Sequence, residues 1–109
     1  MNDIRISDML AMQHALYEHH KDAWTPRTPQ TGRDMLLWLV EEVGEMAAII
    51  KKQGDDAIMH DAATRAHFVE EMADVMMYLH EVMICYGIDA QEFSQAYVEK
   101  HTRNITRKY

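Results

Sequence analysis

Glycine, proline and cysteine are scarce in this chain of 109 residues. Four Gly and two Pro leave little material for tight turns between short strands, and ten Met suit helices that pack through adaptable side chains. The single cysteine, Cys85, excludes a disulfide framework and a cysteine-rich zinc site within one chain. Because Cys85 lies in an apolar run, we expect a small buried hydrophobic side chain. The composition therefore predicts an all-α fold.

Long apolar runs and an excess of positive charge are also missing. No stretch reaches the ~18 apolar residues of a membrane span, and residues 1–7 lack the basic start and apolar core of a signal peptide. We therefore expect a cytoplasmic protein with no membrane partner. The net charge of −7 argues against a nucleic-acid polymer as partner, because Lys and Arg supply most of the affinity for a phosphate backbone. An acidic excess is more consistent with a site that binds a cation than with a surface that binds nucleic acid.

The length suits a single domain over residues 1–109. A helical chain of this size buries only part of the apolar surface that it carries, so we expect it to associate with further copies. Residues 22–32 hold both prolines and are predicted to be irregular, and residues 55–64 form a turn or a weak helix. Apolar spacing and capping signals predict four helices, over residues 4–21, 33–53, 65–86 and from Asp89 almost to the C-terminus.

Two of these helices share a pattern of acidic residues inside otherwise apolar sequence. The pattern reads EEVGEM in the second helix and EEMADV in the third. In a helical projection, Glu42 and Glu45 border an apolar stripe formed by Leu39, Val43, Met46 and Ile50. In the third helix, Glu71 and Asp74 border a stripe formed by Phe68, Met72, Val75, Leu79 and Val82. The two helices thus present their acids in the same way.

Acids three residues apart on a helix are surface neighbours, and their like charges repel. If the two helices pack antiparallel, four carboxylates converge at one edge of the bundle. Withdrawing carboxylates from water is costly without compensation, so the arrangement makes sense around a bound cation. Oxygen ligands without His or Cys suit Mg²⁺ or Mn²⁺ better than zinc, and Mg²⁺ readily takes phosphate oxygens as further ligands. The alternative interpretation is two solvated helix faces that point outward.

The motifs E-E-x-x-E at residues 41–45 and E-x-x-D at residues 71–74 occur on successive long helices. In these motifs the chain resembles the MazG-like members of the all-α nucleoside triphosphate pyrophosphatase superfamily. The resemblance implies a four-helix bundle-like core, completed by formation of a homodimer or homotetramer. It also implies that Glu41 holds a second metal or positions water. The metal ligands that it implies are Glu42, Glu45, Glu71 and Asp74.

The activity implied by this resemblance is Mg²⁺-dependent hydrolysis of an NTP or dNTP between the α and β phosphates. The products are a nucleoside monophosphate and pyrophosphate, as in house-cleaning of the nucleotide pool. The acidic residues are consistent with it, because metal ions neutralise charge on phosphates and lower the pKa of a bound water. A second hypothesis belongs to a different class of function. In this hypothesis the chain is a metal-stabilised helical oligomer or a nucleotide-sensing module, and its carboxylates hold a cation without turnover.

Five further residues are candidate substrate contacts. Lys100, Asn104 and Arg107 share one face of the last helix and resemble the family's basic C-terminal ending, which reaches phosphate or sugar. Alternatively, their cations simply suit the carbonyl end of a helix. Trp24 either stacks on the base or anchors its loop to the bundle. Tyr78, one turn after the acidic motif of its helix, either hydrogen-bonds a phosphate or packs.

Overall fold

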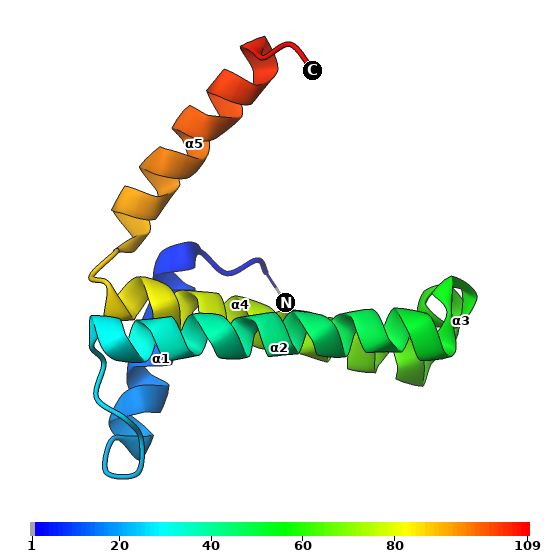
Figure 1. Cartoon of the computed structure of the whole chain (residues 1–109), viewed down its shortest axis with the longest axis horizontal. Coiled ribbons are helices and arrows are strands. Elements are labelled where there is room, and N and C mark those ends of the chain that lie inside the picture. Colours follow the sequence, from blue (N-terminus) through cyan, green and yellow to red (C-terminus); the bar gives the residue numbers. More distant parts are fainter. Residues whose placement is uncertain (1) are drawn as a thin grey trace.

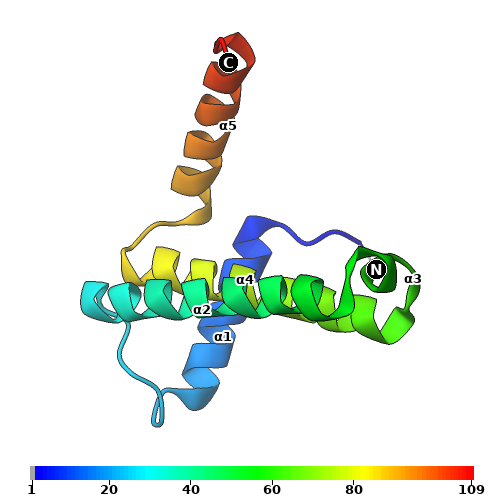
Figure 2. The same cartoon turned by 45° about the vertical axis from the view of Figure 1, so that its right-hand side comes forward.

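The computed structural model describes residues 2–109, and within that range it is helical without strands. Helices α2 and α4 lie side by side and antiparallel, α1 crosses α4, and the short α3 joins α2 to α4 (Figure 1). Helix α5 rises away from this body, and among the other helices it contacts only α1 (Figure 2). No helix in the described range is long and apolar enough to cross a membrane. The bounds are α1 Ile6–His20, α2 Pro29–Gln53, α3 Asp55–His60, α4 Ala62–Cys85 and α5 Ala90–Thr106.

Helix α2 begins four residues earlier than predicted. The Thr28 hydroxyl accepts a hydrogen bond from the backbone N–H of Thr31 at 3.2 Å and so caps the helix. Pro29 then occupies the first helical position, where the missing N–H of proline costs no helical hydrogen bond. The prediction that residues 22–32 are irregular throughout was therefore wrong at its end, because Pro29 starts the helix there.

The other helix ends follow local signals in the sequence. Asp61 caps α4 by accepting a hydrogen bond from the N–H of Thr64 at 2.9 Å, which moves the start of α4 to Ala62 from the predicted residue 65. The predicted cap of α5 is confirmed, since Asp89 accepts from the N–H of Glu92 at 2.9 Å. Gly54 and Gly87 end α2 and α4 with φ of 85° and 69°, a backbone conformation that favours glycine.

The interface between α2 and α4 includes Leu39 and Met46 of the predicted apolar stripe, but it is shifted around α2 away from the other two residues. Val43 and Ile50, predicted to lie in the apolar stripe, are 45% and 46% exposed. Met72 of α4 was likewise predicted to be in the stripe and is exposed. The residues of α2 that recede from solvent, at three- and four-residue spacing, are Met35, Leu39, Glu42, Met46 and Ile49. Glu42 therefore lies in line with the interface.

The single chain has a thin core and a large surface. It exposes 8453 Å², whereas a compact monomer of 12.8 kDa exposes about 6,300 Å². Its radius of gyration is 16.4 Å, against about 13 Å for a compact domain of this length. Cys85 is buried, as predicted.

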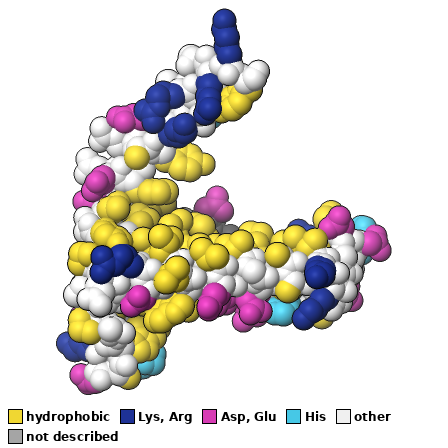
Figure 3. Space-filling model, viewed as in Figure 1, with side chains coloured by type: hydrophobic (Ala, Val, Ile, Leu, Met, Phe, Trp, Pro, Cys, Tyr) yellow, Lys and Arg dark blue, Asp and Glu magenta, His cyan; other side chains and the backbone are white. Residues whose placement is uncertain are grey.

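Hydrophobic side chains gather along the α2–α4 layer on the side from which α5 rises (Figure 3). The exposed large hydrophobic side chains of these two helices include Leu36, Val40, Val43, Val69, Met72 and Met76.

Gly32 permits the close approach of α2 to the end of α4. A Cβ at this position would lie 2.7 Å from the ring of Tyr86 and 3.0 Å from Cβ of Cys85. We therefore expect Gly32→Ala to lower the free energy of unfolding by about 1–3 kcal/mol, because it overpacks this contact. The matched control is Gly44→Ala. A Cβ there meets nothing within 4 Å, so the variant should gain about 0.5–1 kcal/mol from helix propensity.

Urea unfolding of both variants at one fixed protein concentration measures the two changes. Equal stabilities for Gly32→Ala and the unsubstituted protein would show that the approach of α2 to α4 is looser than described.

Candidate functional site

Three carboxylates meet where α2 packs against α4. Glu42 comes from α2, and Glu71 and Asp74 come from α4. One oxygen of each lies within 4.8 Å of the others, and all three side chains are half-buried. The antiparallel packing that the sequence predicted does bring these acids together. The set supplies only oxygen ligands, which is the chemistry that Mg²⁺ and Mn²⁺ prefer.

The surroundings of Glu42 raise the pKa of its carboxyl, chiefly through burial and then through the neighbouring acids. Burial raises the pKa of the Glu42 carboxyl, and a hydrogen bond to Glu71 adds to this effect. The negative charges of Glu71, Asp74 and Glu45 raise the pKa further. Among residues 2–109, the only basic side chain within 4 Å of the three carboxylates is that of His67, whose Nε2 lies 3.4 Å from Glu71. No Lys or Arg of the described chain offsets their charge.

The fourth predicted ligand, Glu45, stands one turn further along α2. Its side chain is exposed and lies outside the close group of three, yet its charge contributes to the raised pKa of Glu42. Glu41 is also exposed. Its charge, with those of Glu42 and Asp74, raises the pKa of the Tyr78 hydroxyl, although burial is the largest cause. Glu41 and Glu45 thus flank the group, and Tyr78 remains a protonated hydrogen-bond donor beside it.

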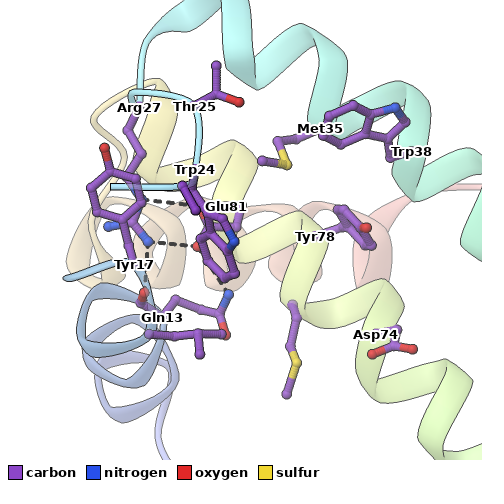
Figure 4. A pocket seen from close by; sticks show the side chains of 13 residues that line it. Gln13, Tyr17, Trp24, Thr25, Arg27, Met35, Trp38, Asp74, Tyr78 and Glu81 are labelled. Carbon is purple, nitrogen blue, oxygen red and sulfur yellow. Dashed lines mark hydrogen bonds and ion pairs between the residues drawn. The ribbon is translucent and has the colours of Figure 1, made fainter. Parts of the chain in front are cut away.

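A pocket of about 460 Å³ opens directly beside the carboxylates. Asp74 belongs to both, since it lines the pocket and also supplies an oxygen to the acidic group. Figure 4 shows Trp38, Tyr78 and Asp74 along one side of the pocket and a hydrogen-bonded network at its other end. Two of the predicted substrate contacts, Trp24 and Tyr78, lie in its wall. The aromatic lining residues are Tyr17, Trp24, Trp38 and Tyr78.

The network at the far end of the pocket was not predicted from the sequence. Arg27 donates to both oxygens of Glu81, from Nε at 3.1 Å and from Nη2 at 2.7 Å. Gln13 donates its side-chain amide to the same carboxylate at 3.1 Å. Glu81 lies seven residues after Asp74 in an apolar run, which is the one signal that places it on the face of the other acids. Arg27 lies in an irregular segment and has no such signal.

The three predicted residues of α5 lie apart from this site. Lys100 and Asn104 belong to α5, which rises away from the body and, among the helices of residues 2–109, contacts only α1 (Figure 1). Arg107 was predicted on the same helix face, but α5 ends at Thr106 and Arg107 follows it in extended backbone. Within one chain the structure therefore does not bring them to the carboxylates. Asn104 carries a buried side-chain oxygen without a hydrogen-bond partner in the described part of the chain.

Comparison with known families gives a match that covers most of the chain. The family model described as the MazG nucleotide pyrophosphohydrolase domain matches residues 30–107. The chain belongs to this MazG family. The MazG match runs from the first turn of α2 to the end of α5 and so includes both acidic motifs. Helix α1 and the segment with Trp24 and Arg27 precede it. No curated protein and no solved structure gave a significant match.

The raised pKa of Glu42 predicts how the stability of the metal-free MazG chain depends on pH. A carboxyl whose pKa is raised by folding contributes stability at low pH and loses it as the pH rises through the folded-state pKa. In EDTA we therefore expect Glu42→Gln to have a higher Tm than the unsubstituted protein. The difference should grow as the pH rises from the ordinary glutamate range toward neutrality.

Added Mg²⁺ should reverse this order. The unsubstituted protein should gain about 2.7 kcal/mol when free Mg²⁺ is about one hundred times its Kd, because an ion that binds only the folded chain stabilises it. Glu42→Gln should gain far less. Differential scanning fluorimetry at several pH values, with EDTA or Mg²⁺, measures both effects. Equal Mg²⁺ stabilisation of the two proteins would contradict a metal site at Glu42.

Proposed function

We propose that this chain is a divalent-metal-dependent nucleoside triphosphate pyrophosphohydrolase. It would cleave an NTP or dNTP between the α and β phosphates and release the monophosphate and pyrophosphate, in house-cleaning of the nucleotide pool. Membership of the MazG family supports this reaction class. The observation that carries the proposal is the position of Asp74, which joins the acidic group to the pocket. A nucleotide with its base in the pocket has its phosphates beside the carboxylates.

The metal in this proposal is Mg²⁺, for which Mn²⁺ can substitute. Glu42, Glu71 and Asp74 would supply the oxygen ligands, and Glu45, one turn further along α2, would be the fourth ligand. The fit rests on three half-buried carboxylates without a Lys or Arg partner in residues 2–109, since such a group favours a cation. When bound, the ion neutralises charge on the phosphates and lowers the pKa of an attacking water.

The protein's own groups then have two tasks around the phosphates. As the water oxygen bonds to phosphorus and the bond to the leaving phosphate oxygen breaks, a carboxylate takes the water's proton. Glu41 suits this role or the binding of a second ion, because its exposed carboxylate flanks the group of three. The Tyr78 hydroxyl, whose raised pKa keeps its proton, suits donation of a hydrogen bond to a phosphate oxygen.

The aromatic pocket suits the nucleobase. Its volume of about 460 Å³ falls within the usual range for small-ligand sites. Base stacking on an aromatic ring contributes about 1–3 kcal/mol. Trp24 and Trp38 offer such rings on opposite elements, the segment before α2 and α2 itself. We assign base contact to this pair and phosphate contact to the carboxylate side.

We propose further that the working form is a homodimer or homotetramer. The chain exposes about 2,200 Å² more than a compact monomer of its mass, which is enough area for a stable interface. The excess includes the apolar side chains along α2 and α4 (Figure 3). In such an oligomer, α5 of one copy would carry Lys100, Asn104 and Arg107 to the phosphates at another copy's carboxylates.

Product analysis tests the reaction directly. With Mg²⁺ and a panel of NTPs and dNTPs, we expect the monophosphate and pyrophosphate by phosphorus NMR, and no turnover in EDTA. Glu42→Gln and Asp74→Asn should each lower kcat/KM at least ~10-fold, because loss of a metal ligand costs at least as much as loss of its supporting shell. Circular dichroism should show unchanged helicity.

The matched control is Asp56→Asn, which removes a carboxylate that is 97% exposed on α3 and should leave turnover unchanged. Retained turnover in Asp74→Asn would sink the ligand assignment. Metal binding without release of pyrophosphate from any nucleotide would favour a nucleotide-sensing or metal-stabilised helical module instead.

Subunit mixing tests the role of α5. The variants Glu42→Gln and Lys100→Ala/Arg107→Ala should each be nearly inactive alone. After subunit exchange, each hybrid dimer regains one site that combines intact carboxylates with an intact α5. Random mixing in a two-fold symmetric dimer then gives about a quarter of the unsubstituted activity. A mixture that stays as inactive as its components would show that α5 does not act across subunits.

A further inference from the structure

The segment between α1 and α2, residues 21–28, forms part of the pocket wall and is called the strap below. It contributes Trp24 and Thr25 to the pocket wall. At its α1 end, the N–H of Trp24 donates to the carbonyl of His20, and the two rings stack with centroids 4.8 Å apart. At its other end, Arg27 bonds to Glu81 of α4. The strap is therefore fixed to two different helices.

Most hydrogen-bond donors of the Arg27 guanidinium are used in attaching the strap. Four of the five guanidinium N–H donors are used, by the two oxygens of Glu81, the carbonyl of Gln13 and Nδ1 of His14. The guanidinium carbon also lies 4.2 Å from the centroid of the Tyr17 ring. An arginine beside a nucleotide pocket ordinarily suggests a phosphate contact. Here the donors that such a contact needs are already occupied.

Glu81, which binds Arg27 of the strap, lies on the same face of α4 as the acids of the proposed metal site. It lies two helical turns after Asp74, with Tyr78 between them. Its side chain is 10% exposed and that of Arg27 is 12% exposed, so water screens this ion pair little. Glu81 thus differs from the acids of the metal site, because a fixed cation neutralises it.

We propose that Arg27 and Glu81 are a pair of positioning residues that hold the strap, and with it Trp24, against the pocket. Building on the function proposed above, the pair sets the affinity for the nucleoside part of the substrate. It leaves the phosphate end and the metal ligands undisturbed. Neither residue contacts the reacting atoms. Loss of the pair frees the strap, so that Trp24 no longer offers a fixed face for stacking.

The steady-state test compares Glu81→Gln and Arg27→Lys with the unsubstituted protein. We expect KM for the preferred nucleotide to rise about tenfold in Glu81→Gln, the loss of one stacking contact, while kcat changes little. Arg27→Lys keeps the charge but loses the two-pronged contact, so its KM should rise less. Arg5→Gln is the control, because it breaks the exposed ion pair with Asp8 and should leave KM unchanged.

A second readout needs no turnover. In a Trp38→Phe background, Trp24 is the only tryptophan, and acrylamide quenching without nucleotide reports how far the strap has opened. Quenching should increase in Glu81→Gln and stay constant in Arg5→Gln. If Glu81→Gln does not fold, Arg27→Lys decides by both readouts.

The outcomes separate the two proposals. If the unsubstituted protein yields no pyrophosphate, the proposed function fails, and the quenching comparison still tests the strap. If the protein is active but the folded variants keep their KM and their quenching, the positioning role is overturned. A fall in kcat with unchanged KM would also overturn it, because that result places the pair in the chemical step.

Discussion

Three negative charges lie in the interface between two antiparallel helices, and no Lys or Arg of the described chain stands within 4 Å of them. Glu42 occupies a position in line with the apolar side chains that join α2 to α4. Packing therefore draws the carboxylates together while their charges push them apart. Burial and the neighbouring negative charges together raise the pKa of Glu42. A bound divalent cation would resolve the opposition, and we propose that the site is arranged around that position.

Helix α4 uses one face for three different tasks. Along it stand an acid of the proposed metal site, a tyrosine beside that site and an acid bonded to the strap: Asp74, Tyr78 and Glu81. The two acids lie two turns apart, yet no basic side chain of residues 2–109 lies within 4 Å of Asp74, whereas Glu81 has an arginine bound to both oxygens. Asp74 is therefore available to bind a metal, whereas Glu81 has a structural role. The pocket lies between Asp74 and Glu81. One end of it carries a carboxylate without an arginine partner, and the other end carries a carboxylate that is paired with Arg27.

Local signals in the sequence predicted most of the helices and the acidic group. The spacing of Glu42, Glu71 and Asp74 was enough, because antiparallel neighbours had to bring the two motifs together. The side of α2 that packs was not predictable, since α2 is apolar on two sides: Leu39 and Met46 face α4, whereas Val43 and Ile50 remain exposed. Spacing alone cannot choose between such sides. The direction of α5 was not predictable either, because among the helices of residues 2–109 it contacts only α1.

The contact between Arg27 and Glu81 shows a second limit of sequence reasoning. The two residues are separated by 54 positions, and Arg27 lies in a segment without periodicity. Only the path of the chain around the pocket brings them together.

We propose that Glu42, Glu71 and Asp74 hold the metal that acts on a nucleotide's phosphates. The decisive measurement uses crystals grown with Mn²⁺ and a nucleoside triphosphate analogue whose α–β bridging oxygen is replaced by NH. We expect an anomalous scattering peak among these three carboxylates, with analogue phosphate oxygens in the same coordination shell. An ordered analogue with no Mn²⁺ peak there, or with Mn²⁺ held elsewhere, would contradict it.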